Sequence, residues 1–195
     1  MKKMTVKLTF TESVLGSLPA NEDIYVDYIG TKAPDLDKID EEVDAISADE
    51  MVEKGMTIFP KENGVPFVYD YQIKGFFKDT CQGLRKIDDT ESAKIKTFKR
   101  VIDKLVFPQP RKILFENYGG IGLCQRPLRA QTPMGERTAL AISEEIGAGA
   151  TLTFDIVMLD DTTEKAVREW LDYGAYSGLG QWRNSGHGRF TWTEV

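Results

Sequence analysis

The sequence has few of the residues that build disulfide frameworks and metal sites. It contains two cysteines, Cys81 and Cys124, and one histidine, His187, among 195 residues. Two separated cysteines make no disulfide framework, and these three residues cannot complete a structural zinc site without carboxylates. We therefore expect reduced thiols in a cytoplasmic protein that holds no metal and no cofactor.

Long apolar runs and the common phosphate-binding motifs are absent as well. No stretch approaches the roughly 18–20 apolar residues that a membrane-spanning helix needs, and the first residues lack the apolar region of a signal peptide. The chain has no Gly-x-x-x-x-Gly-Lys-Ser/Thr motif, and its glycine-rich stretch follows a predicted helix instead of opening one. The sequence favours neither a membrane protein nor an enzyme with a nucleotide cofactor.

Charge is unevenly distributed along the chain. The net charge of -6 opposes phosphate binding, which needs lysine and arginine. Residues 21–62 hold 13 acidic side chains against 4 lysines, whereas residues 72–112 hold 11 basic side chains against 5 acidic ones. Such a polarised molecule can carry a basic face, although scattered solvated helix faces would give the same counts.

Hydrophobic periodicity predicts a single α+β domain over residues 1–195. Alternating apolar residues indicate strands over residues 4–10, 112–116, 121–128, 151–159 and 189–193. Helical spacing indicates helices over residues 70–86, 91–105 and 162–174, and two more within an acidic surface insertion at residues 21–55. A hairpin-like excursion is expected around residues 57–69. The arrangement favours antiparallel strands with interleaved helices.

A glycine-rich stretch near the C-terminus is the strongest functional signal. Within fifteen residues it holds five glycines: Gly174, Gly178, Gly180, Gly186 and Gly188. This density indicates left-handed backbone or close approach of another group to the main chain. Between the glycines stand hydrogen-bond donors and the stacking face of Trp182, which suit an extended ligand such as RNA. A series of tight turns leading into the last strand would also explain the glycines.

Three stretches resemble the RAMP superfamily of CRISPR-associated proteins, and especially the backbone subunits of multi-subunit effectors. Residues 178–190 resemble the C-terminal glycine-rich loop of that superfamily, which ends in Gly-x-Gly-Arg and a strand. Residues 65–79 resemble its proline, short strand, Lys-Gly and basic-helix signature, with Lys74 and Gly75 at the Lys-Gly position. Residues 144–154 resemble an acidic residue followed by a strand that a glycine introduces.

The resemblance implies a ferredoxin-like, RNA-recognition-motif-like antiparallel sheet with helices that binds single-stranded RNA. Because the one histidine lies late in the chain, and because Ser185 and Cys81 have no base nearby in the sequence, we expect the protein to be non-catalytic. It implies that RNA lies between the Lys-Gly helix start and the glycine-rich loop. The residues expected to contact RNA are Lys74, Gly75, Lys78, Arg85, Gly180, Trp182, Arg183, Gly186, His187 and Arg189. It also implies a subunit of an effector complex, or a homo-oligomer.

Two departures from that pattern leave other functions open. Residues 69–72, Tyr-Asp-Tyr-Gln, replace a turn that is usually small, and an acidic insertion at residues 21–55 suits a protein partner better than RNA. One alternative is a divergent, phage-borne member that keeps the fold and binds protein, for example as an anti-CRISPR. The second is an endoribonuclease that uses His187 as a base, or Asp23 or Asp27 with a metal ion.

Overall fold

The computed structural model describes residues 1–20, 56–132, 135–160 and 163–195. The acidic insertion expected at residues 21–55, with its two helices, lies outside these ranges. Among the described residues, no helix is long and apolar enough to cross a membrane.

The main sheet contains seven antiparallel strands. Its order is β12-β1-β11-β8-β6-β5, and β7 also pairs with β11. The strands are β1 (Lys2–Phe10), β5 (Lys61–Glu62), β6 (Val65–Tyr69), β7 (Val106–Gln109), β8 (Lys112–Glu116), β11 (Thr151–Met158) and β12 (Phe190–Glu194). At its centre, β1 pairs with β11 from Lys2↔Met158 to Thr9↔Thr151. The predicted alternation is confirmed, because Met4, Val6, Leu8 and Phe10 are all buried.

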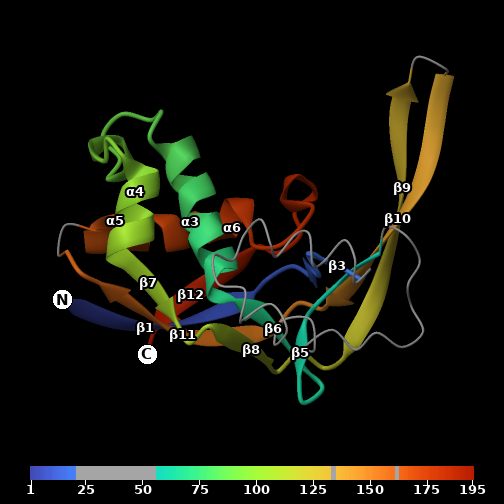
Figure 1. Cartoon of the computed structure of the whole chain (residues 1–195), viewed down its shortest axis with the longest axis horizontal. Helices are drawn as coiled ribbons and strands as arrows, with labels where there is room; N and C mark the ends of the chain where they lie inside the picture. Colours follow the sequence, from blue (N-terminus) through green and yellow to red (C-terminus); the bar gives the residue numbers. More distant parts are fainter. Residues whose placement is uncertain (21–55, 133–134, 161–162) are drawn as a thin grey trace, which may run out of the picture.

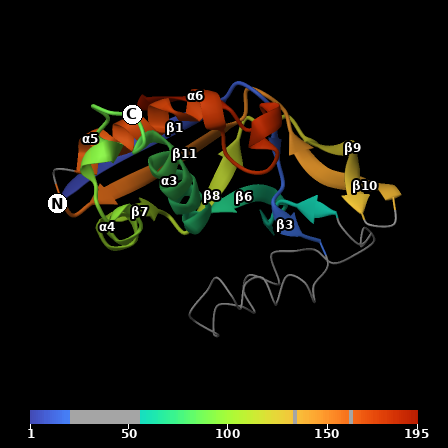
Figure 2. The ribbon, with the colours of Figure 1, turned by 90° about the horizontal axis from the view of Figure 1, so that it is seen from above.

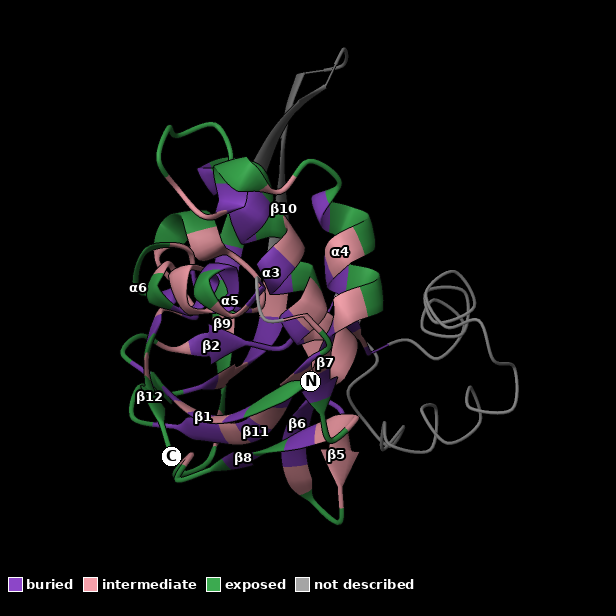
Figure 3. Ribbon diagram, turned by 90° about the vertical axis from the view of Figure 1, so that its left-hand side faces the viewer, coloured by how far each residue is buried: buried purple, intermediate pink, exposed green. Residues whose placement is uncertain are grey.

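Helices cover one face of this sheet (Figure 1). They are α3 (Asp70–Leu84), α4 (Phe98–Leu105), α5 (Thr163–Asp172) and the short α6 (Gly174–Ser177). The buried side of α3 is the stripe that helical spacing predicts: Ile73, Phe76, Phe77, Thr80, Cys81 and Leu84. Phe77 packs on Trp170 of α5 with ring centroids 5.4 Å apart. This helical layer and the inner face of the sheet enclose the core (Figure 3).

The predicted basic helix over residues 91–105 is wrong in its first half. The chain forms a 3₁₀ helix, η2 (Ser92–Lys94), before α4 begins at Phe98. The Glu169 carboxylate of α5 holds η2 in place by accepting hydrogen bonds from the backbone N–H groups of Glu91 and Ser92 at 2.8 and 3.0 Å. The helix is interrupted at Ile95, whose backbone is extended (φ −91°, ψ 105°).

A smaller second sheet carries a long hairpin. It contains β2 (Val14–Leu15), β3 (Leu18–Pro19), β4 (Thr57–Ile58), β9 (Ile121–Thr132) and β10 (Gly135–Ile146). Strands β9 and β10 pair from Ile121↔Ile146 to Thr132↔Gly135 and extend away from the helical layer (Figures 1 and 2). The sequence prediction of a single strand over residues 121–128 was too short, and it missed β10 entirely.

Candidate nucleic-acid interface

The glycine-rich loop joins α6 to β12 and folds as a compact series of turns. Five of its residues have positive φ: Gly178, Gly180, Trp182, Gly186 and Gly188. The N–H of Leu179 donates to the Gly188 carbonyl at 2.8 Å, which closes the loop on itself. The Gly188 N–H donates to the Ser13 carbonyl at 2.8 Å and ties the loop to the segment before β2.

Close backbone approaches require three of these glycines. A Cβ on Gly188 would overlap the Leu179 carbonyl, and one on Gly178 would lie 2.6 Å from the His187 carbonyl oxygen. A Cβ on Gly180 would lie 2.9 Å from the Leu15 carbonyl oxygen of β2. Tight turns and packing therefore explain the glycines at both ends of the loop without any ligand.

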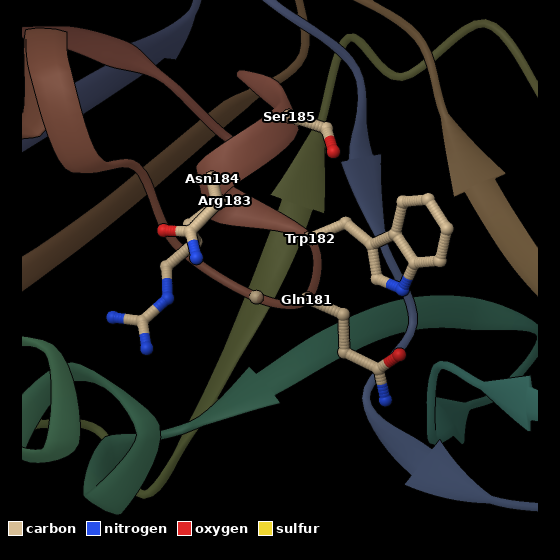
Figure 4. Close-up of a pocket in the computed structure, with 6 residues that line it drawn as sticks. Gln181, Trp182, Arg183, Asn184 and Ser185 are labelled. Carbon is tan, nitrogen blue, oxygen red and sulfur yellow. The ribbon is translucent and has the colours of Figure 1, made fainter. Parts of the chain in front are cut away.

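The middle of the loop is open. Residues 180–185 line a hollow of about 630 Å³, and their side chains spread around its rim (Figure 4). Trp182 lies in left-handed backbone at φ +56°, a conformation that costs a non-glycine residue about 1–2 kcal/mol. Asn184 and Ser185 are exposed, and Gln181 is half-buried. Residues held in uncommon backbone conformations cluster at functional sites, so this strained, open segment is the functional candidate in the loop.

A second pocket of about 330 Å³ connects the loop with β2 and α3. Gly75 and Asp79 line it from α3, and Gly180 and Arg183 line it from the loop. The Arg183 guanidinium donates to the Asp79 carboxylate at 2.7 Å. The structure thus brings the Gly75 turn of α3 next to the glycine-rich loop, as the predicted two-sided groove requires.

Two basic residues of the predicted groove point elsewhere. The Lys78 ammonium pairs with the Asp103 carboxylate of α4 at 2.6 Å. The Lys74 ammonium lies 4.4 Å from the centroid of the Phe107 ring and 3.5 Å from the Asp103 carbonyl. Burial lowers the pKa of Lys74, and the Asp103 charge opposes that shift. Both ammonium groups therefore face α4 and β7 instead of the glycine-rich loop.

Arg85, His187 and Arg189 complete the predicted set. Arg85 stacks over Phe98, with its guanidinium carbon 5.3 Å from the ring centroid, and lies at the far end of α3. The His187 imidazole Nδ1 is 3.0 Å from the Ser13 hydroxyl, so this ring helps to anchor the loop. Arg189 is half-buried, and its side chain lies against Gly186, with its guanidinium carbon 3.7 Å from the position of a Cβ there.

One residue of this region was missed by the sequence analysis. Arg126 of β9 is 9% exposed, and its guanidinium carbon lies 3.0 Å from the centroid of the Trp182 ring. Its Nε, Nη1 and Nη2 atoms are buried and have no hydrogen-bond partner. Burial lowers the pKa of Arg126, whereas Cys124 and Glu145 oppose that shift. The available signal was one charged residue within the apolar run of the predicted strand over residues 121–128.

The fold of the chain is similar to that of a chain in the Type III-B Cmr-beta complex. No protein-family model and no curated protein matches this protein. A chain of the Type III-B Cmr-beta complex bound to cognate target RNA aligns with a TM-score of 0.56 and 14% identity, over 98% of this chain and 59% of that chain. A chain of a Type IV-B CRISPR complex aligns with a TM-score of 0.47 and 13% identity, over 100% of this chain and 90% of that one.

The first of these likenesses confirms the predicted fold class, an α+β, ferredoxin-like arrangement of antiparallel strands and helices. The protein spans about 59% of the length of the Cmr-beta chain. Membership of the RAMP superfamily stays a prediction.

Proposed function

We propose that the protein is a non-catalytic, RNA-binding subunit of a CRISPR ribonucleoprotein complex. The observation that carries this proposal is the open, strained middle of the glycine-rich loop, where Gln181, Trp182 and Arg183 surround a hollow of about 630 Å³. Amide, indole and guanidinium groups are those that hold the phosphates, sugars and unstacked bases of single-stranded RNA. The shared fold with a chain of an RNA-bound effector complex supports the same reading.

The directions of the side chains favour the glycine-rich loop over the two lysines of α3 as the main RNA contact. Gly75 of α3 and Arg183 of the loop line one pocket, so RNA between α3 and the loop would pass over these two residues. Lys74 and Lys78 would act from the α4 side of the same helix, about 100° and about 60° away from Gly75 around its axis. We therefore propose the loop as the main contact, with the two lysines as a flanking basic surface.

Equilibrium binding of a fluorescently labelled single-stranded RNA tests this function. Affinity should fall steeply with rising salt, because phosphate contacts release counterions. Arg183→Gln should weaken binding by about tenfold and reduce the slope of log K against log salt by about 0.7, the value for one phosphate contact on a single strand. The matched control is Lys99→Gln, which removes one charge from an exposed position on α4.

Each outcome of this experiment bears on the proposal. No binding by the wild-type protein at low salt would overturn it. Equal losses from both substitutions would mean that diffuse charge attracts the RNA and that the loop is not the site. The length of the RNA after incubation separates binding from cleavage. Shortening by the wild type that His187→Ala abolishes would favour the endoribonuclease alternative, whereas intact RNA supports a non-catalytic role.

The acidic segment at residues 21–55 remains the proposed contact for a protein partner. Its 12 acidic residues, from Glu22 to Glu53, would repel a phosphate chain and attract a basic protein surface. Whether the chain serves an effector complex or blocks one as a phage-borne protein depends on that partner.

A further inference from the structure

Arg126 of β9 differs in its hydrogen bonds from Arg168 of α5 and from Arg183 of the glycine-rich loop. Arg168 donates to Glu164 and Glu194, and Arg183 donates to Asp79. Arg126 makes no hydrogen bond from any guanidinium nitrogen, although all three nitrogens are closed to solvent. In the part of the chain that the structure describes, it is the one guanidinium buried in full without an acceptor.

Such burial is unfavourable for folding. A guanidinium offers five N–H donors and stays charged in proteins, so removal from water without an acceptor carries a large desolvation penalty. Stacking on the electron-rich face of Trp182 returns part of that free energy. The Glu145 charge attracts Arg126 without a hydrogen bond. The Arg126 guanidinium therefore destabilises the folded protein, because no group of the protein fully neutralises its charge.

The location of this cation points to a ligand. Trp182 is both the stacking partner of Arg126 and a lining residue of the loop hollow. The left-handed backbone at Trp182 sets the position of the indole ring between the hairpin and the loop. Gln181, Asn184 and Ser185 add neutral donors and acceptors beside it. A cation, an indole ring and neutral polar groups together fit a ligand that carries an anionic group, a ring and polar groups better than they fit a small inorganic anion.

We propose that Arg126, held on the Trp182 ring where β9 meets the glycine-rich loop, is an anchoring site for one phosphodiester of bound RNA. The fork of the guanidinium would take two phosphate oxygens in a bidentate contact. Because its nitrogens are closed to solvent, the Trp182 or Arg126 side chain must turn when the phosphate enters. This inference rests on the proposed function. It names one residue of the RNA-binding site, Arg126, and the group of the RNA that this residue contacts, a phosphodiester.

Removal of the Arg126 charge should have opposite effects on RNA affinity and on thermal stability, and the test measures both. Arg126→Met keeps an unbranched side chain on β9 and removes the charge. RNA affinity should fall by about ten- to a hundredfold, as for a hydrogen bond to a charged group, and the salt slope should fall by about 0.7. Thermal stability should hold or rise, because the substitution removes an unpaired buried charge. Arg126→Lys keeps the charge but loses the fork, so it should retain an intermediate RNA affinity.

Arg168→Met is the matched control. Arg168 of α5 is paired with the carboxylates of Glu164 and Glu194, and α5 lies away from the β9–β10 hairpin (Figure 1). Its substitution should lower or leave unchanged the melting temperature and leave RNA affinity at the wild-type value. Emission of Trp182, isolated as the difference between the wild type and Trp182→Phe, should change when the wild type binds RNA.

The outcomes separate this inference from the proposed function. RNA binding by the wild type tests the function, and the ratio between the wild type and Arg126→Met tests the site. Wild-type affinity in Arg126→Met, or a fall in its melting temperature with unchanged affinity, would overturn the site and leave RNA binding standing. Binding of poly-glutamate in place of RNA, lost in Arg126→Met, would identify a carboxylate ligand and overturn the phosphate assignment.

Discussion

The glycine-rich loop has a packed half and an open half, and the two use glycine for different reasons. In the packed half, Gly178 and Gly188 lie so close to neighbouring backbone that neither has space for a Cβ. In the open half, Gly186 also has positive φ, but its nearest neighbour is the flexible Arg189 side chain at 3.7 Å from a Cβ. A high density of glycine can therefore result from close packing or from left-handed backbone, and neither cause identifies a ligand.

The functional information lies between the glycines instead. Trp182 is a bulky residue in a conformation that glycine adopts at no steric cost. A chain shaped by packing alone would place a small residue there, whereas an indole at this position provides the stacking surface for Arg126. The contrast between packed glycines and one strained tryptophan can be tested by graded substitutions along the loop.

Gly188→Ala should have the largest effect. The new methyl group would overlap the Leu179 carbonyl, which is itself fixed in the closed turn, and φ +74° adds strain for any residue with a Cβ. Left-handed strain and overpacking together should lower the free energy of unfolding by about 3 kcal/mol or more. Urea unfolding followed by circular dichroism measures the loss. A loss below about 1 kcal/mol would mean that the closed turn at Leu179 is not a fixed part of the fold.

Gly174→Ala should have an intermediate effect, because its obstacle is a side chain. A Cβ at this position in α6 would overlap the ring of Phe190, which is 1% exposed and cannot swing into solvent. Overpacking costs about 1–3 kcal/mol, and the higher helix propensity of alanine returns up to about 1 kcal/mol. A net loss of about 1–2 kcal/mol is expected in the same assay.

The Gly174 experiment has an internal check. In Phe190→Leu, which shortens the obstructing side chain, the added cost of Gly174→Ala should shrink, so that the double-mutant cycle shows coupling between the two positions. Strictly additive losses would show that the methyl group is accommodated elsewhere, and that Phe190 does not set the limit.

Local patterns in the sequence were sufficient for the elements whose burial follows a simple period. The alternation of β1 and the stripe on α3 were read correctly because each faces the core on one side. Strand β10 was missed because its residues 135–146 include three glutamates and two alanines, which are depleted in strands. Its strand conformation comes from pairing with β9 along its whole length, a contact that no local pattern records.

The candidate site was predictable in its location but not in its contacts. The glycine-rich loop and the Gly75 turn were identified from motifs, and they do share a pocket. The direction of Lys74 and Lys78 depends on Asp103 of α4, and the stack of Arg126 on Trp182 joins residues 56 positions apart. Neither partner can be recognised before the chain is folded, because both contacts are set by the packing of separate elements.

Gly186→Ala should have the smallest effect and gives the sharpest test of the comparison. Its φ of +91° penalises a Cβ, but no neighbouring atom lies closer than 3.7 Å to it. Conformational strain alone should lower the free energy of unfolding by about 1–2 kcal/mol. Gly186→Asn should cost less, since asparagine tolerates left-handed backbone better than alanine. A loss as large as that of Gly188→Ala would mean that the backbone around Gly186 is packed as tightly as that around Gly178 and Gly188, and the contrast between the two parts of the loop would then have to be rejected.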